Sequence, residues 1–271
     1  MNPAAGVLSV WAHYDDDLIF GCPTIDRAVV AGFPVTSLFT TAGDAGRDAA
    51  YIAAREEGIR AAYEAMFGAP LQWRDEEVDF AGVRAVGWSA EEAPVRVLSF
   101  RFPDGRPNGT GFDATGNQSL RRLLEGGIPV ICDIDGRVEA SADTLVAALA
   151  DALAQHPGAR LLCHAPRIGG ELTERDHSDH WSTGAFLRRA VDRTGIAEQS
   201  VSWRIGYPSS ILPAVLEGAA LDRKLRIFRA YAAYDPVVDR PDPAGTLALP
   251  GFGDWLRREY ALVAGRAVAL G

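Results

Sequence analysis

The sequence predicts an α/β fold, in which helices cover both faces of a mostly parallel sheet. Short apolar runs that are typical of buried strands alternate with longer segments whose apolar residues recur at helical spacing. Polar residues follow several of these runs directly, as they do where ligands bind at the carboxyl ends of parallel strands. A chain of 271 residues, 48% of them hydrophobic, is long enough to form one large core.

The predicted elements alternate along the chain. Strands are expected over residues 7–11, 35–40, 95–102, 129–134 and 160–163. Helices are expected over residues 12–32, 48–67, 145–154, 180–194, 224–234 and 255–270. Pro23 would kink the first helix or mark its true start. This order favours a single Rossmann-like domain over residues 1–271, with a core over 1–200 and a C-terminal elaboration over 201–271.

The most informative motif follows the first predicted strand. Residues 13–17 read His-Tyr-Asp-Asp-Asp, and three adjacent carboxylates repel one another. A divalent cation would offset that repulsion, since imidazole nitrogen and carboxylate oxygen are both good zinc ligands. The alternative is a solvated acidic turn that caps the next helix.

A second motif, Asp-His-Ser-Asp-His-Trp, occupies residues 176–181. His177 and His180 are one helical turn apart and would share a face of the predicted helix. A catalytic zinc ion needs three protein ligands and an open position, and His13, Asp16 and His180 would supply those ligands. His164, which follows a predicted strand, is the next candidate.

These residues carry a resemblance to a known family. Residues 12–17 resemble the A-H-P-D-D-E signature of the PIG-L/LmbE family of zinc-dependent N-acetylglucosamine deacetylases, and residues 177–180 are similar to its H-P-D-H signature. Residues 40–46, 55–57 and 102–105 resemble the family's T-x-G-D-A-G, R-E-E and P-D-G segments. The matches occur in family order and together span about residues 7–190.

The resemblance implies a set of catalytic roles. One zinc ion per chain would be held by His13, Asp16 and His180. Asp15 would be the general base that takes a proton from the attacking water. His177 would stabilise the oxyanion or protonate the leaving amine.

It also implies substrate contacts. Arg55 and Asp104 would hold sugar hydroxyls. Tyr14 stands where the family has Pro and would place an aromatic ring near the cleft, and Asp17 replaces Glu at a position not expected to bind metal. Four more aromatic residues are candidates to line a cleft: Trp203, Tyr207, Phe252 and Trp255.

The implied substrate is a small glycoconjugate that carries an N-acetylglucosaminyl group. The string over residues 11–17 is most similar to deacetylases that act on teicoplanin-type glycopeptide pseudoaglycones. Inositol-linked glucosaminides and diacetylchitobiose are the alternatives.

The composition limits the kinds of partner that we expect for this protein. A formal net charge of −9 argues against nucleic acid and anionic membrane surfaces. No apolar run reaches membrane-spanning length, and the first residues lack the pattern of a leader peptide, so we expect a cytoplasmic protein without membrane insertion. The three cysteines show no C-x-x-C spacing, which argues against a disulfide framework.

Two other functions compete with this hypothesis. Residues 132–136 read Cys-Asp-Ile-Asp-Gly and resemble the nucleophile motif of haloacid-dehalogenase-like phosphatases, although a hairpin turn explains them better. A non-catalytic sugar-binding domain is the other alternative. The second carboxylate, Asp15 beside Asp16, favours an enzyme, because a structural metal site has no use for it.

Overall fold

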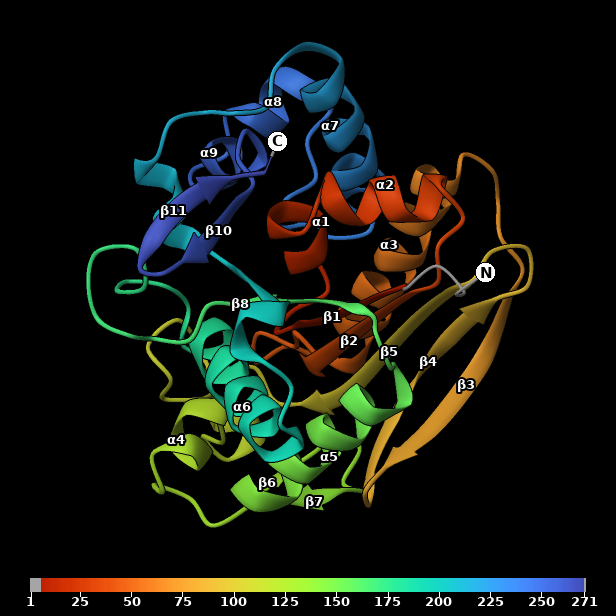
Figure 1. Cartoon of the computed structure of the whole chain (residues 1–271). Coiled ribbons are helices and arrows are strands. Elements are labelled where there is room, and N and C mark those ends of the chain that lie inside the picture. The colour runs from red at the N-terminus through yellow and green to blue at the C-terminus, as the bar shows by residue number, and fades with distance from the viewer. Residues whose placement is uncertain (1–5, 271) are drawn as a thin grey trace.

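The computed structural model describes residues 6–270 and contains a central nine-stranded sheet (Figure 1). From one edge to the other its strands are β11 (Arg266–Ala269), β10 (Tyr260–Val263), β9 (Val201–Arg204), β8 (Arg160–His164), β1 (Val7–Trp11), β2 (Val35–Thr41), β5 (Val95–Phe102), β4 (Val83–Ala90) and β3 (Trp73–Phe80). The central strands β9, β8, β1, β2 and β5 are parallel, and both edges are antiparallel. The predicted α/β fold is confirmed.

Helices cover both faces of the sheet (Figure 1). On one face lie α4 (Leu120–Leu124), α5 (Ala142–Gln155) and α6 (Ser178–Thr194). On the other lie α1 (Asp16–Phe20), α2 (Thr24–Val30), α3 (Ala49–Phe67), α7 (Gly218–Ala232), α8 (Pro243–Leu247) and α9 (Phe252–Leu256). The two faces have separate cores, because successive strand residues point to opposite sides. Leu8 and Val10 of β1 belong to one core, and Val7 and Trp11 to the other.

Three predicted elements differ from the structure. The first helix is divided into α1 and α2, with Pro23 directly before α2. The strand expected over 129–134 is reduced to β6 (Ile131–Cys132), which pairs with β7 (Glu139–Ala140) in a separate small sheet. The terminal helix expected over 255–270 is wrong. Ala264 and Gly265 have φ angles of 48° and 75°, so the chain turns there and forms the β10–β11 hairpin.

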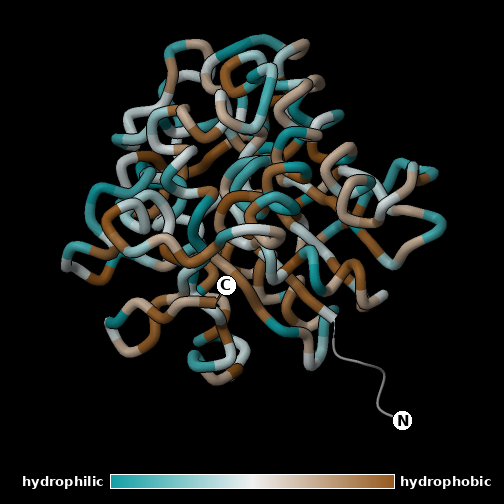
Figure 2. The backbone as a smooth tube through the Cα atoms, turned by 90° about the horizontal axis from the view of Figure 1, so that it is seen from above, coloured by the Kyte–Doolittle hydropathy of each residue, from teal (hydrophilic) through white to brown (hydrophobic). Residues whose placement is uncertain are grey.

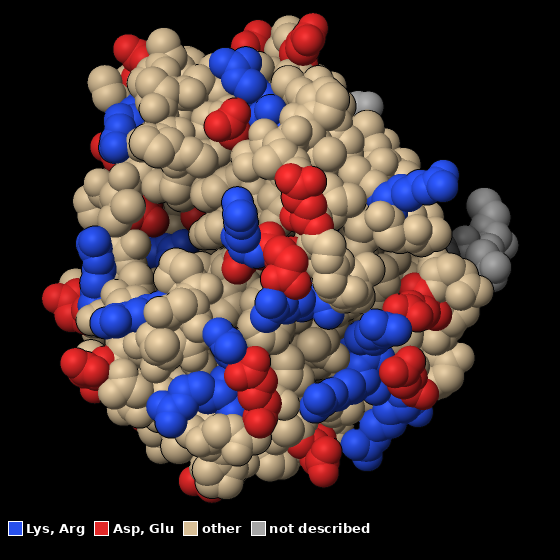
Figure 3. Space-filling model, turned by 90° about the vertical axis from the view of Figure 1, so that its left-hand side faces the viewer, with Lys and Arg blue, Asp and Glu red and all other residues tan. Residues whose placement is uncertain are grey.

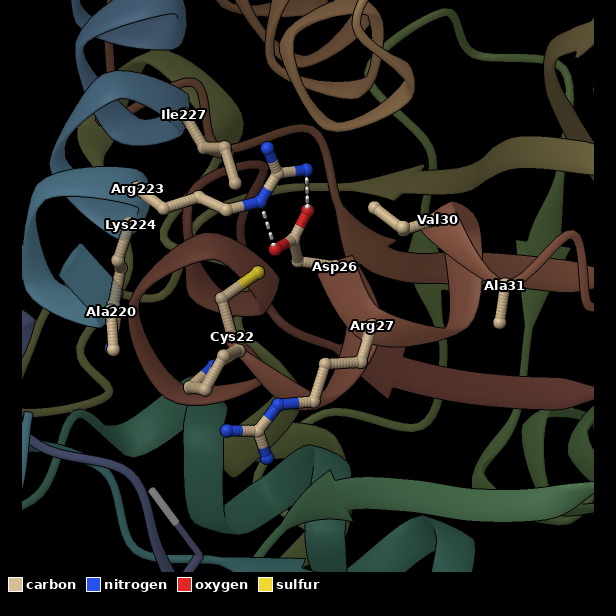
Figure 4. Close-up of a pocket in the computed structure, with 10 residues that line it drawn as sticks. Cys22, Asp26, Arg27, Val30, Ala31, Ala220, Arg223, Lys224 and Ile227 are labelled. Carbon is tan, nitrogen blue, oxygen red and sulfur yellow. Dashed lines mark hydrogen bonds and ion pairs between the residues drawn. The ribbon is translucent and has the colours of Figure 1, made fainter.

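The C-terminal region continues the sheet and shares the core of the rest of the chain. Arg204 of β9 donates to Glu259 at 2.6 Å, and both side chains are fully buried. Arg223 of α7 forms a bidentate pair with Asp26 of α2 at 2.6 and 2.7 Å (Figure 4). The first contact ties β9 to the segment before β10, and the second fixes α7 against the N-terminal half.

The molecular surface is mixed in character. Seen from above, hydrophobic segments run through the middle of the molecule (Figure 2). Acidic and basic side chains are interspersed over the face that Figure 3 shows, without an extended basic area. Within residues 6–270, no helix combines the length and hydrophobicity needed to cross a membrane.

Candidate active site

The predicted site residues converge at the carboxyl ends of the parallel strands. His13 to Asp16 follow β1, Asp104 follows β5, and His180 lies in the first turn of α6. The ring centroids of His13 and His180 are 5.4 Å apart, and their donor nitrogens lie within 4.8 Å of each other. Two segments more than 160 residues apart in sequence therefore form one buried cluster.

Asp16 lies at the centre of three imidazoles. Its Oδ1 is 3.1 Å from Nε2 of His180, and its Oδ2 is 2.9 Å from Nε2 of His164 and 3.3 Å from Nδ1 of His13. Oδ2 also accepts from the backbone N–H of His13 at 2.7 Å, which fixes the turn after β1. Burial alone would raise the pKa of Asp16, but the neighbouring histidines outweigh it and hold the pKa well below its usual range.

His180 is oriented as a metal-ligating histidine would be. Its Nδ1 donates to Oδ1 of Asp176 at 2.8 Å, which turns Nε2 toward Asp16. That Nε2 is buried and makes no well-aligned hydrogen bond within residues 6–270, although Oδ1 of Asp16 lies 3.1 Å away. Burial lowers the pKa of His180, but Asp16 and Asp176 raise it to about 9, so a metal ion would displace a proton from this ring.

Three overlapping groups in the described part of the chain bring ligand atoms within 4.8 Å of one another. They are His13, His177 and His180; Asp16, His164 and His180; and His13, Asp104, His177 and Asp179. The predicted ligands His13, Asp16 and His180 are drawn from the first two groups. Imidazole and carboxylate donors suit zinc, so the residues present fit the implied ion.

His164 contacts two members of the cluster, His180 and Asp16. Its ring stacks on that of His180, with centroids 3.9 Å apart and planes within 4°. Burial lowers the pKa of His164 to about 4, so the neutral ring can donate from Nε2 to Asp16. This contact orients the carboxylate of Asp16.

Asp15 is held by an arginine and makes none of the imidazole contacts of Asp16. Its Oδ1 accepts from Nη2 of Arg55 at 2.7 Å, while Nη1 of Arg55 donates to the carbonyl of Gly43 at 2.6 Å and Nε donates to the hydroxyl of Tyr231 at 2.5 Å. A side chain at Gly43, whose φ is +57°, would lie against this guanidinium. Burial raises the pKa of Asp15, and Arg55 opposes that shift. Arg55, which was expected to hold a sugar hydroxyl, holds Asp15.

His177 presents a hydrogen-bond donor to the cavity. Its Nδ1 accepts from the backbone N–H of Asp179 at 3.2 Å, so the proton of the neutral ring is on Nε2. Burial is the main cause that lowers the pKa of His177 well below its usual value. Nε2 lies 4.0 Å from Oδ1 of Asp104, whose backbone N–H donates to Asp44 at 2.7 Å.

The cluster opens into a cavity of about 150 Å³. Six of the predicted site residues line it: His13, Asp15, Asp16, Arg55, Asp104 and His177. Tyr207, Phe252 and Trp255 also line it, as expected, whereas Trp203 lies elsewhere. Tyr51 and Asp235 also line it and were not anticipated, although Tyr51 lies one helical turn before Arg55.

Tyr14 does not reach this cavity. Its side chain is only 1% exposed, packs on Phe39 and donates to Glu56 at 3.1 Å. Tyr14 lies between His13 and Asp15 in the turn, but its side chain points the other way, toward Phe39 of β2. The expected contact of Tyr14 with substrate is therefore not supported by its position.

The phosphatase-like motif forms a turn. Oδ1 of Asp133 accepts from the backbone N–H groups of Arg137 and Val138, and Gly136 has a φ of 66°. Asp135 is paired with Arg101 at 2.9 Å. Neither aspartate lines the cavity, which agrees with the hairpin alternative for this motif.

The fold and site define an α/β protein with a buried imidazole–carboxylate centre at the ends of its parallel strands. The model of the PIG-L family, described as GlcNAc-PI de-N-acetylase, matches residues 8–191. The chain belongs to the PIG-L family, whose members are deacetylases. No curated protein matches the chain.

Among solved structures, the chain is similar to the conserved protein TT1542 from Thermus thermophilus. The identity is 15% and the TM-score is 0.45, and the match covers 94% of this chain and 85% of that chain.

Proposed function

We propose that this protein is a zinc-dependent hydrolase that removes the acetyl group from the nitrogen of an N-acetylglucosaminyl unit. The observation that carries the proposal is the division of labour between two consecutive carboxylates. Asp16 is surrounded by histidines, whereas Asp15 lines the cavity beside them and is held by Arg55.

His13, Asp16 and His180 would hold one zinc ion. When bound, zinc lowers the pKa of water to about 7 and polarises a carbonyl group. Asp176 fixes the ring of His180, and His164 fixes the carboxylate of Asp16. The ligands are therefore oriented before any ion binds.

Asp15 transfers the proton, and His177 stabilises the negative charge that develops on the substrate. Asp15 accepts a proton from the water that attacks the acetyl carbonyl, for which its raised pKa suits it. The Nε2–H group of His177 donates a hydrogen bond to the carbonyl oxygen as negative charge develops, which is worth roughly 3 kcal/mol for a well-placed donor. Asp15 then returns the proton to the amide nitrogen as the bond between that nitrogen and the acetyl carbon breaks, so that acetate and a free amino sugar are released.

The substrate is a small glycoconjugate, and we propose a glycopeptide pseudoaglycone as its aglycone class. Asp104, which lines the same cavity as Asp15, would accept a hydrogen bond from a sugar hydroxyl. Inositol-linked glucosaminides and diacetylchitobiose are the alternatives.

The experiment is an acetate-release assay on these three substrates with the zinc-loaded protein. Removal of the ion with a chelator should abolish release, and added zinc should restore it. Acetate release that is indifferent to the chelator would contradict the metal dependence, and no release from any substrate would contradict the hydrolase.

A further inference from the structure

A second, larger cavity adjoins the candidate active site. It has a volume of about 600 Å³, four times that of the cavity beside the histidines. Tyr207 and Trp255 line both cavities. A substrate that fills the smaller cavity with one sugar would therefore extend past these two rings into the larger one.

The two rings form a fixed aromatic wall. Their centroids are 4.1 Å apart with planes within 7°, and the indole N–H of Trp255 donates to the carbonyl of Tyr207 at 3.0 Å. The backbone N–H of Tyr207 donates at 3.0 Å to Asp176, which also orients His180. Asp176 therefore fixes the position of the two rings relative to His180, and the rings need no rearrangement to receive a flat group.

The rest of the larger cavity combines apolar and charged side chains. Ile211 lines it and is 55% exposed, so its side chain can contact a bound group. The charged residues are Glu171, Glu174, Asp254 and Arg175. Glu174 is paired with Arg167 and Asp254 with Arg258, whereas Glu171 and Arg175 have no ion-pair partner among residues 6–270 and carry opposite charges.

We propose that this cavity binds the group attached to the acetylated sugar, and that it selects an aromatic group over a small aliphatic one. The proposal rests on the deacetylase function proposed above and adds the substrate class to it. An aromatic ring would stack on Trp255 and contact Ile211.

The test compares two glycosides on the zinc-loaded full chain: phenyl N-acetylglucosaminide and methyl N-acetylglucosaminide. The kcat/KM for acetate release should be about 3- to 10-fold higher for the phenyl than for the methyl glycoside, as expected for one aromatic contact. Dissociation constants of the same two compounds, measured on the Asp15→Asn variant, should follow the same order.

Matched variants distinguish a loss of aromatic stacking in the cavity from a general loss of folding or activity. Trp255→Ala should remove the phenyl-over-methyl ratio, whereas Trp73→Ala should keep it. Trp73 is half-buried on β3 and, like Trp255, donates its indole N–H at 3.0 Å.

Equal kcat/KM values for the phenyl and methyl glycosides, or a ratio that survives Trp255→Ala, would overturn the proposed cavity role. If binding to the Asp15→Asn variant favours the phenyl glycoside but the parent chain releases no acetate, only the hydrolase proposal fails.

Discussion

Consecutive residues with the same side chain have different environments in this site. Asp15 and Asp16 are both buried, yet Asp15 contacts a guanidinium and Asp16 contacts imidazoles. Burial therefore raises the pKa of Asp15, while the histidines lower that of Asp16. Neighbouring carboxylates in such contrasting environments are typical of a base next to a metal ligand.

Replacement of the proposed base tests its role at the residue scale. Asp15→Asn should retain zinc and lower kcat by roughly two to four orders of magnitude, because the amide cannot accept the proton from water. Elemental analysis and acetate release on the same sample measure both effects. Full activity with full zinc would refute the assignment of Asp15 as the base.

We propose Asp176 as a positioning residue for His180, one of the proposed metal ligands. Asp176→Asn should weaken zinc affinity about 10- to 100-fold, since the neutral amide no longer strengthens the basicity of the imidazole. Competition with a chelating dye measures that affinity. The fold should persist, because Asn retains an oxygen that can accept from the backbone of Tyr207. Unchanged zinc affinity would contradict the positioning role of Asp176.

At the residue scale, the sequence indicated the proposed metal ligands but not the residues that orient them. The proximity of His13, Asp16 and His180 follows from motifs that end a strand and begin a helix. Asp176 could not be assigned in advance, because its partner depends on how the loop before α6 packs against Tyr207. Tyr14 was misplaced, since sequence proximity to His13 does not reveal which way the turn points its side chain.

At the scale of elements, the central strands were predicted and the edge hairpins were missed. The β3–β4 hairpin contains a run of five acidic or basic residues in seven positions, so it lacks the apolar pattern of a buried strand. Its turn, Ala81-Gly82, has φ angles of 49° and 88°, as a two-residue hairpin requires, although Ala is uncommon there. Charged residues on an edge strand also discourage pairing with another chain.

His156 connects the end of α5 to β2 and should give a pH-dependent contribution to stability. Its Nε2 lies 3.0 Å from the hydroxyl of Thr36, and burial lowers the pKa of His156 below the unfolded value. The unfolded chain thus takes up the proton first, and stability is lost as pH falls below about 6.5.

His156→Gln should reduce this loss. Urea unfolding of both proteins between about pH 7.5 and about pH 5 measures the difference, since histidines shared by the two proteins contribute equally. Parallel pH profiles for the two proteins would contradict the contribution of His156.

The buried pair Arg204–Glu259 joins β9 to the segment before β10. Glu259→Gln should destabilise the fold by about 3–5 kcal/mol, because the guanidinium of Arg204 remains buried without its counter-charge. Glu91→Gln, which breaks an exposed pair with Arg74, is the control and should cost less than about 1 kcal/mol. If denaturant unfolding shows the same loss of free energy of unfolding in both variants, burial does not determine the contribution of the Arg204–Glu259 pair.

At the scale of the whole molecule, two parts of the chain build the site. The segment that matches the PIG-L family supplies the imidazole–carboxylate cluster and Asp15. The later residues add Tyr207, Asp235, Phe252 and Trp255 to the cavity walls. This division could not be predicted, because no motif marks the later residues and the last predicted helix proved to be two strands. Our proposals assign the chemistry to the family segment and substrate selection to the C-terminal region.

The measurement that tests the account most directly is the zinc content of the purified chain beside its His13→Ala and His180→Ala variants. One zinc ion per chain is expected in the parent protein, and close to none in either variant, because each variant loses one of only three protein ligands. A full equivalent of zinc in folded His180→Ala protein, or none in the reconstituted parent, would contradict a single centre built from the two ends of this site.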